Sequence, residues 1–136
     1  MNSSPTTANF AALQTEFGEQ LVSTPGTSTA GLSMNLTHSI LSEPLVRLAI
    51  AQSTDRVTMN SNLLQDANIA TTTWMPPSVA GLDCVAIDCF PDVGFDQQGA
   101  KKNLAKAGYP DGEGLPTFQY MTVAIPENER ISEFLQ

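Results

Sequence analysis

The acidic residues between positions 83 and 96 are the first candidates for chemistry in this chain. Asp83, Asp88, Asp92 and Asp96 fall within one stretch, and carboxylate oxygens are ligands that Ca²⁺ prefers. Their spacing does not match the loop of an EF-hand, in which oxygen ligands recur at alternate positions and end on a glutamate. We therefore predict no metal site, and we expect Asp96 to cap a helix.

Two cysteines, Cys84 and Cys89, lie in the same stretch. Two thiols are too few to close a zinc site, and His38, the single histidine, is distant in sequence. In an oxidising compartment the pair can form a disulfide across a small loop, whereas in a reducing compartment both stay free thiols. The sequence leaves these two alternatives open.

His38 and Ser39 are neighbours, which raises the question of a hydrolase. Nucleophilic catalysis needs a nucleophile, a base and an orienting group gathered at one place, and two adjacent residues do not make such a set. We expect His38 to be a surface or packing residue. The chain is therefore not expected to be an enzyme, and none of its motifs indicates a cofactor.

The charge of the chain argues against several classes of partner. The chain has fourteen acidic and six basic residues, which gives a formal net charge of −8 over 136 residues. Without a phosphate-binding stripe of Lys and Arg, we expect no nucleic-acid partner and no anionic membrane surface. No apolar run approaches the roughly 18 residues of a membrane span, so we expect no direct membrane insertion. The first residues do not resemble a signal peptide.

The first half of the chain is predicted to contain three helices. Apolar residues at helical spacing predict a helix over residues 8–21. Ser42 is expected to cap a second helix that carries Pro44 in its first turn. Ser53-Thr54-Asp55 then restarts a third helix.

The second half is predicted to contain two more helices. Asp96 caps the first of them, Gly108 ends it in the left-handed conformation, and Pro110 prevents its resumption. Pro126 opens the last helix. Residues 66–96, between the two halves, are expected to be largely irregular.

Two segments have the composition of β-strands, Gly31–Leu36 and Thr117–Ile125. Helices beside a few strands predict an α/β (α+β) fold. Two strands alone are marginal as a sheet, so we expect this chain to be a section of a longer protein.

Four stretches resemble one protein family in their order and spacing. They are Leu32-Ser33-Met34-Asn35-Leu36, Pro44–Arg56 with a "VRxAxxxxxDR" pattern, Thr73-Trp74-Met75-Pro76-Pro77, and Phe95–Gly114 with an "FDxxKAxxLLxxAGYPDG" pattern. They resemble the peptide/nickel class of extracellular solute-binding proteins, the oligopeptide- and dipeptide-binding components of ABC importers. The likeness covers about residues 8–136. Gly99 departs from the pattern, and the Cys84/Cys89 loop is not expected from it.

The resemblance implies a periplasmic-binding-protein-like receptor with two lobes, which closes around a peptide or similar small solute and delivers it to an ABC permease. Residues 1–30 would form an N-terminal helix and inter-lobe connection, and residues 31–136 part of the second lobe. The other lobe and a signal peptide would lie outside this sequence. The implied location is periplasmic or extracellular.

The resemblance also implies where a ligand would be bound. The segment Gly31–Leu36 is similar to the strand that reaches the ligand cleft, so Ser33, Met34 and Asn35 are candidate contacts. Trp74 is a further candidate, because an indole can stack on a ligand.

Structural roles compete with these functional ones. Asn35 could order the turn after the strand, and Trp74 could pack under the long loop. Arg47 and Arg56 are expected to pair with a nearby acid rather than with a ligand. For the whole chain, the alternative hypothesis is a stand-alone α/β interaction module that forms homo-oligomers through exposed apolar faces and has no transport ligand.

Overall fold

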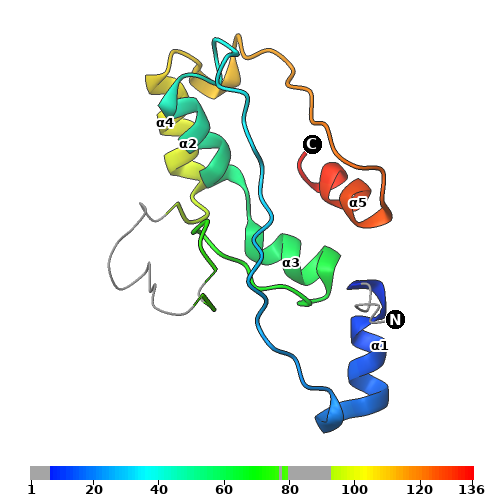
Figure 1. Ribbon diagram of the computed structural model, residues 1–136. Helices are drawn as coiled ribbons and strands as arrows, with labels where there is room; N and C mark the ends of the chain where they lie inside the picture. Colours follow the sequence, from blue (N-terminus) through cyan, green and yellow to red (C-terminus); the bar gives the residue numbers. More distant parts are fainter. Residues whose placement is uncertain (1–6, 77, 80–92) are drawn as a thin grey trace. The chain divides into compact units, whose positions relative to one another are not determined.

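The computed structural model describes residues 7–76, 78–79 and 93–136 (Figure 1). The helices in this part of the chain are α1 (Thr7–Phe17), α2 (Pro44–Ser53), α3 (Arg56–Leu64), α4 (Gln97–Lys106) and α5 (Pro126–Phe134), with 3-10 turns η1 (Gly18–Gln20) and η2 (Pro110–Gly112). The helices predicted from the sequence are thus confirmed. Both cysteines of the possible disulfide lie outside the described residues, as do three of the four clustered acids: Cys84, Cys89, Asp83, Asp88 and Asp92.

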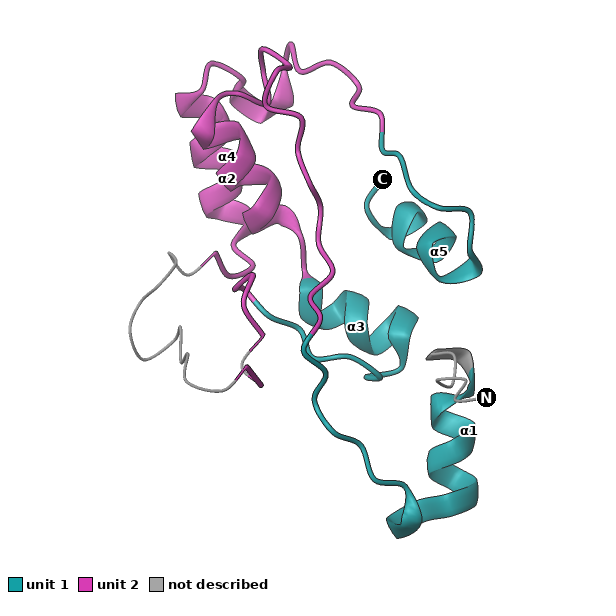
Figure 2. Ribbon diagram, in the orientation of Figure 1, with its two compact units in different colours: residues 1–27, 56–71, 120–136 teal, residues 28–55, 72–119 magenta. Residues whose placement is uncertain are grey.

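The chain divides into two compact units, each assembled from separate stretches of sequence (Figure 2). Residues 1–27, 56–71 and 120–136 make the first unit, which holds α1, α3 and α5. Residues 28–55 and 72–119 make the second, which holds α2 and α4. The predicted boundary between residues 30 and 31 stays a prediction.

In the second unit, helices α2 and α4 lie side by side (Figure 1). Small side chains fill the contact: Val46, Ala49 and Ala100 are buried, with exposed fractions of 0, 1 and 4%. Polar bonds then fix the two helices to each other. The amide of Asp96 donates to Gln52 O at 2.9 Å, and Asn103 Nδ2 donates to Gln52 Oε1 at 2.8 Å.

The beginning of α4 follows the sequence prediction. Asp96 has an extended backbone, and its Oδ1 accepts a hydrogen bond from Gly99 N at 2.9 Å, which satisfies one of the free amides of the first turn. Gly99 lies close to both partners of this junction. A Cβ at position 99 would collide with the Asp96 carboxylate and lie 3.2 Å from Gln52 Nε2.

The end of α4 also follows the prediction. Gly108 has a φ of +95°, in the left-handed region. Its amide donates to Ala105 O at 3.1 Å, and the amide of Tyr109 donates to Leu104 O at 2.9 Å. This pair of bonds is a Schellman motif, which pairs carbonyl groups that the helix leaves open. Pro110 then begins η2 rather than extending α4.

The cap of α2 is one residue away from the expected position. Pro44 occupies the first turn as predicted, but the capping oxygen is Glu43 Oε1, which accepts from Leu45 N at 3.3 Å. The prediction that Ser42 caps was wrong: Glu43 holds the N-cap position, and the hydroxyl of Ser42 donates to Ser39 O at 2.6 Å. That bond belongs to the turn that precedes the helix.

In the first unit, α3 contacts α5, and Leu64 at the end of α3 is buried. Asn60 is 9% exposed, and its Nδ2 donates to Asn68 O at 2.9 Å and to Asp66 Oδ1 at 3.3 Å. Asp66 has a φ of +55°. The side chain of Asn60 therefore holds the turn that leads away from α3.

The two predicted strands are not paired in the described part of the chain. Residues 31–36 and 117–125 carry no strand assignment there. A strand is defined by the hydrogen bonds that it makes with a neighbour, and composition alone does not supply one. The α/β class therefore stays a prediction.

Removing the cap of α4 tests how much this junction stabilises the chain. We expect Asp96→Ala to lower the free energy of unfolding by about 1 kcal/mol, the usual cost of losing a side-chain N-cap. Urea unfolding followed by circular dichroism measures the change. Gln98→Ala, at an exposed position of the same helix, is the control and should cause no loss.

Gly99→Ala should also destabilise the chain, although alanine is favoured over glycine inside helices by about 1 kcal/mol. The added Cβ would displace the Asp96 carboxylate from its capping position. The same unfolding experiment applies. A Gly99→Ala variant more stable than the parent would contradict the tight junction described above.

The bond between Asn103 and Gln52 can be isolated by a double-mutant cycle. Because this pair joins residues 51 positions apart, we expect Gln52→Ala and Asn103→Ala to show a coupling energy of about 1 kcal/mol in unfolding. Gln52→Ala combined with Lys102→Ala is the control cycle, with a coupling near zero. Equal coupling in both cycles would count against a specific bond.

Candidate functional site

Trp74, one of the four predicted ligand contacts, lies against Gly31, which precedes the other three in the chain. The edge of its indole approaches Gly31 so closely that a Cβ there would be only 2.6 Å from Trp74 Cζ3. The side chain nevertheless remains 61% exposed. The edge of the indole at Cζ3 therefore lies against the backbone of Gly31, and most of the side chain is open to solvent, an arrangement that leaves ring surface for stacking on a ligand.

Asn35 is engaged in its own turn. Its Oδ1 accepts hydrogen bonds from Thr37 N at 3.0 Å and from Thr37 Oγ1 at 2.8 Å. This is an Asx turn, the structural role that the sequence left open for Asn35. Of its neighbours, Ser33 is exposed and Met34 is half-buried. The segment thus offers a hydroxyl, a thioether and the amide nitrogen of Asn35.

Arg47 has a structural role, as expected, but its partners are not carboxylates. Its Nη1 donates to Leu41 O at 2.9 Å and to Ser42 O at 2.7 Å. These bonds hold the turn before α2 against the helix. One guanidinium nitrogen, Nη1, thus bonds to two carbonyl oxygens.

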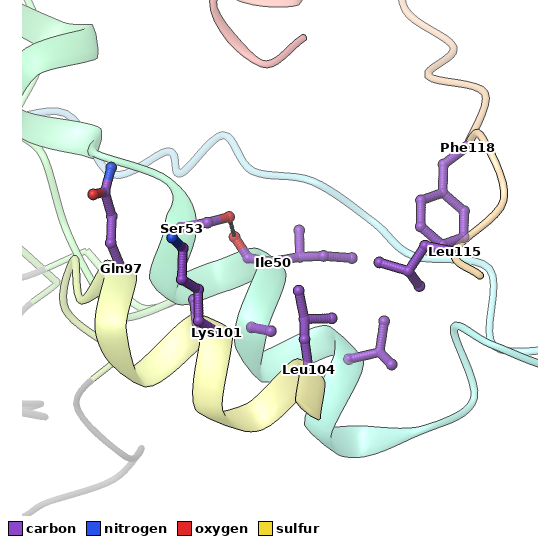
Figure 3. A pocket seen from close by; sticks show the side chains of 10 residues that line it. Ile50, Ser53, Gln97, Lys101, Leu104, Leu115 and Phe118 are labelled. Atoms are coloured by element: carbon purple, nitrogen blue, oxygen red, sulfur yellow. Dashed lines mark hydrogen bonds between the residues drawn. The ribbon is translucent and has the colours of Figure 1, made fainter. Parts of the chain in front are cut away.

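A ring contact joins the turn before α2 to the segment after η2. His38 meets Phe118 edge to face, with ring centroids 5.7 Å apart and an interplanar angle of 71°. His38 is exposed and its ring packs against Phe118, which agrees with the prediction of a surface or packing residue. Phe118 lies at one end of a groove beside α2 and α4 (Figure 3).

This groove has a cavity volume of about 410 Å³. Its lining residues come from the two helices and the segment after η2: Val46, Ala49, Ile50, Ser53, Gln97, Ala100, Lys101, Leu104, Leu115 and Phe118. Figure 3 shows Ser53, Gln97 and Lys101 at one end and Leu115 and Phe118 at the other. One end is therefore polar and the other is apolar.

Sequence reasoning missed the groove, although a signal for it exists. The helical residues of the lining fall at positions 46, 49, 50 and 53 of α2 and at 97, 100, 101 and 104 of α4. Both sets have the spacing of one helix face. Recognising the groove required knowing that these two faces lie together.

The described residues show neither a metal site nor a membrane span. No group of three or more His, Cys, Asp or Glu side chains within the described ranges could hold a metal ion. None of the helices found there combines the length and the apolar character needed to cross a bilayer. Asp96, the described member of the acidic cluster, caps α4.

The contact between Trp74 and Gly31 can be tested by fluorescence, because Trp74 is the single tryptophan of the chain. We expect Gly31→Ala to push the indole away and to increase its quenching by acrylamide. Gly26→Ala is the matched control, since nothing lies within 4 Å of a Cβ at position 26. Unchanged quenching in Gly31→Ala would contradict the contact.

Comparison with known proteins gives the chain a family. The family model of the bacterial extracellular solute-binding proteins, family 5, middle part, matches residues 1–136. Heme-binding protein A of Haemophilus influenzae is 27% identical over 108 residues, which are 79% of this chain and 19% of that protein. The chain thus spans about a fifth of the length of this relative. No solved structure matches. Because the family model covers the whole sequence, the chain belongs to the family 5 bacterial extracellular solute-binding proteins, in the middle part of their sequence.

Proposed function

We propose that this chain is part of the solute-binding component of an ABC importer that takes up oligopeptides or dipeptides. The observation that carries the proposal is the family match along residues 1–136. Members of this family are described as extracellular solute-binding proteins, which favours solute capture over catalysis. A periplasmic or extracellular location and an ABC permease as partner belong to the same proposal.

The arrangement of the second unit supports a scaffolding role for the most family-like segments. Residues 44–56 and 95–114 contain α2 and α4, which pack through buried small side chains. A rigid helix pair of this kind can hold a neighbouring binding segment in a fixed position. In the complete receptor, we propose that residues 31–36 and 117–125 join a larger sheet as strands, which would give the lobe its α/β character.

Ser33, Met34, Asn35 and Trp74 are the proposed ligand contacts. Asn35 would act through its amide nitrogen, because its oxygen already accepts two bonds from Thr37. Trp74 would stack on an apolar part of the solute, since most of its surface is exposed. Ser33, which is exposed, would add a hydroxyl.

Heme is the rival ligand, because the relative from Haemophilus influenzae is called a heme-binding protein. A histidine is a common ligand of heme iron, and His38 is the single histidine of this chain. His38 is exposed, and its ring contacts Phe118. A substitution of His38 can therefore distinguish heme binding from peptide binding.

Calorimetry with a mixture of di- and tripeptides, beside absorbance titration with hemin, tests the proposal. We expect peptides to bind a two-lobed receptor that contains this chain, and to bind the chain alone at least about tenfold more weakly, because one cleft wall would come from the other lobe. Trp74→Ala should weaken peptide binding further.

Two outcomes would contradict the proposal. Equal affinity of the chain and of the two-lobed receptor would show that the chain forms a complete site. A saturable shift of the hemin absorbance band that disappears in His38→Ala, without peptide binding, would replace the peptide by heme.

A self-associating module is the alternative function, and exposed apolar side chains favour it. Val22, Met121 and Val123 have exposed fractions of 84, 90 and 70%. Apolar surface of this kind drives association when it is contiguous. Light scattering on the chain distinguishes the two functions: a stable dimer without affinity for solutes would support the module, whereas a monomer that binds peptides would exclude it.

A further inference from the structure

Gly31 and Trp74 meet at one edge of the indole ring. A Cβ at position 31 would lie 2.6 Å from Trp74 Cζ3, and the two ring atoms bonded to Cζ3 would both be farther away, Cη2 at 3.5 Å and Cε3 at 3.6 Å. A point above the ring face would be nearly as close to these two neighbours as to Cζ3 itself. Gly31 therefore approaches the ring along its plane, and this contact covers neither face of the indole.

The backbone of Gly31 does not itself require glycine. The φ of Gly31 lies outside the left-handed region, so an alanine could adopt the same backbone conformation. What the position requires is the absence of a side chain. Because carbon atoms pack best at about 3.5–4.0 Å, a Cβ at position 31 would displace the edge of the indole by roughly 1 Å.

The backbone on both sides of Trp74 is held separately. Thr73 Oγ1 donates a hydrogen bond to Met75 O at 2.8 Å, which closes a short turn around Trp74. Thr73 and Met75 are half-buried, whereas the side chain of Trp74 is 61% exposed. The turn thus fixes the position from which the indole projects, and Gly31 sets how near the edge of the ring comes to the segment that starts at residue 31.

We propose that Gly31 is a positioning residue for Trp74, and that the indole in this position gives the solute site a preference for peptides with an aromatic side chain. This inference rests on the proposed function, in which Trp74 stacks on the solute. An indole face pairs well with another aromatic ring in an offset-stacked or edge-to-face arrangement. Met34, three residues after Gly31, adds a thioether, which also favours contact with aromatic rings.

The proposed contacts favour an aromatic ring over a cationic side chain. An indole face can also attract the Lys or Arg of a peptide. However, none of the four proposed contacts is charged, so a cationic side chain would lose water without gaining an anionic partner among them: Ser33, Met34, Asn35 and Trp74. A lysine peptide is therefore the comparison that the experiment needs.

Calorimetry with three tripeptides, on a two-lobed receptor that contains this chain, tests the inference. The probes are Ala-Phe-Ala, Ala-Leu-Ala and Ala-Lys-Ala. We expect the parent receptor to bind the Phe peptide about fivefold more tightly than either of the others, which is the effect of one aromatic pair. In Gly31→Ala this ratio should fall to about one, because the displaced indole no longer meets the aromatic side chain. Gly26→Ala is the matched control and should keep the ratio, since nothing lies within 4 Å of a Cβ at position 26.

A second variant separates positioning from a general defect. Trp74→Ala should remove the same preference, and Gly31→Ala combined with Trp74→Ala should lower the ratio no further, because Gly31 acts through Trp74. Circular dichroism checks that each variant is folded. A loss of folded receptor would weaken the binding of all three peptides alike and would leave their ratio unchanged.

The contrary results are distinct from one another. An unchanged ratio in Gly31→Ala, or a parent receptor that binds the three peptides equally, would overturn the inference and leave the proposed function in place. A preference for the Lys peptide that disappears in Trp74→Ala would show that the indole selects a cation, which also overturns the inference. A parent receptor that binds none of the three peptides would overturn the proposed function, and the inference with it.

Discussion

The second unit depends on a single residue that serves two helices. Gln52 stands near the end of α2 and accepts two hydrogen bonds from the α4 region, one through its backbone oxygen and one through its side chain. The first bond receives the amide of Asp96, which is also the residue that caps α4. The start of α4 is thus hydrogen-bonded to the end of α2. The groove between the two helices takes its position from this junction.

Features that depend on local sequence were predictable. Pro44, Asp96, Gly108 and Pro126 mark helix ends because their backbone preferences and capping groups act within one turn. Ser42 shows the limit of this reasoning. Both Ser42 and Glu43 carry an oxygen that can cap, and in the structure Glu43 caps while Ser42 bonds to Ser39.

Features that depend on contacts between distant segments were not predictable in the same way. The groove forms only where the faces of α2 and α4 meet. The residue pattern of each helix does not specify which other helix it packs against. Residues 31–36 and 117–125 have strand composition, but their pairing depends on neighbours that composition does not specify. Of the candidate site, the turn role of Asn35 was foreseen because it is local, while the position of Trp74 against Gly31 was not.

Gly99 sets a condition on how this unit can move. Its missing side chain lets the Asp96 carboxylate and Gln52 approach, and a shift of α4 against α2 would break the bonds that Asp96 N and Asn103 Nδ2 make to Gln52. The helix pair should therefore travel as one rigid body when the protein changes conformation. Any hinge in the unit must then lie in the segments outside the pair, such as residues 28–43.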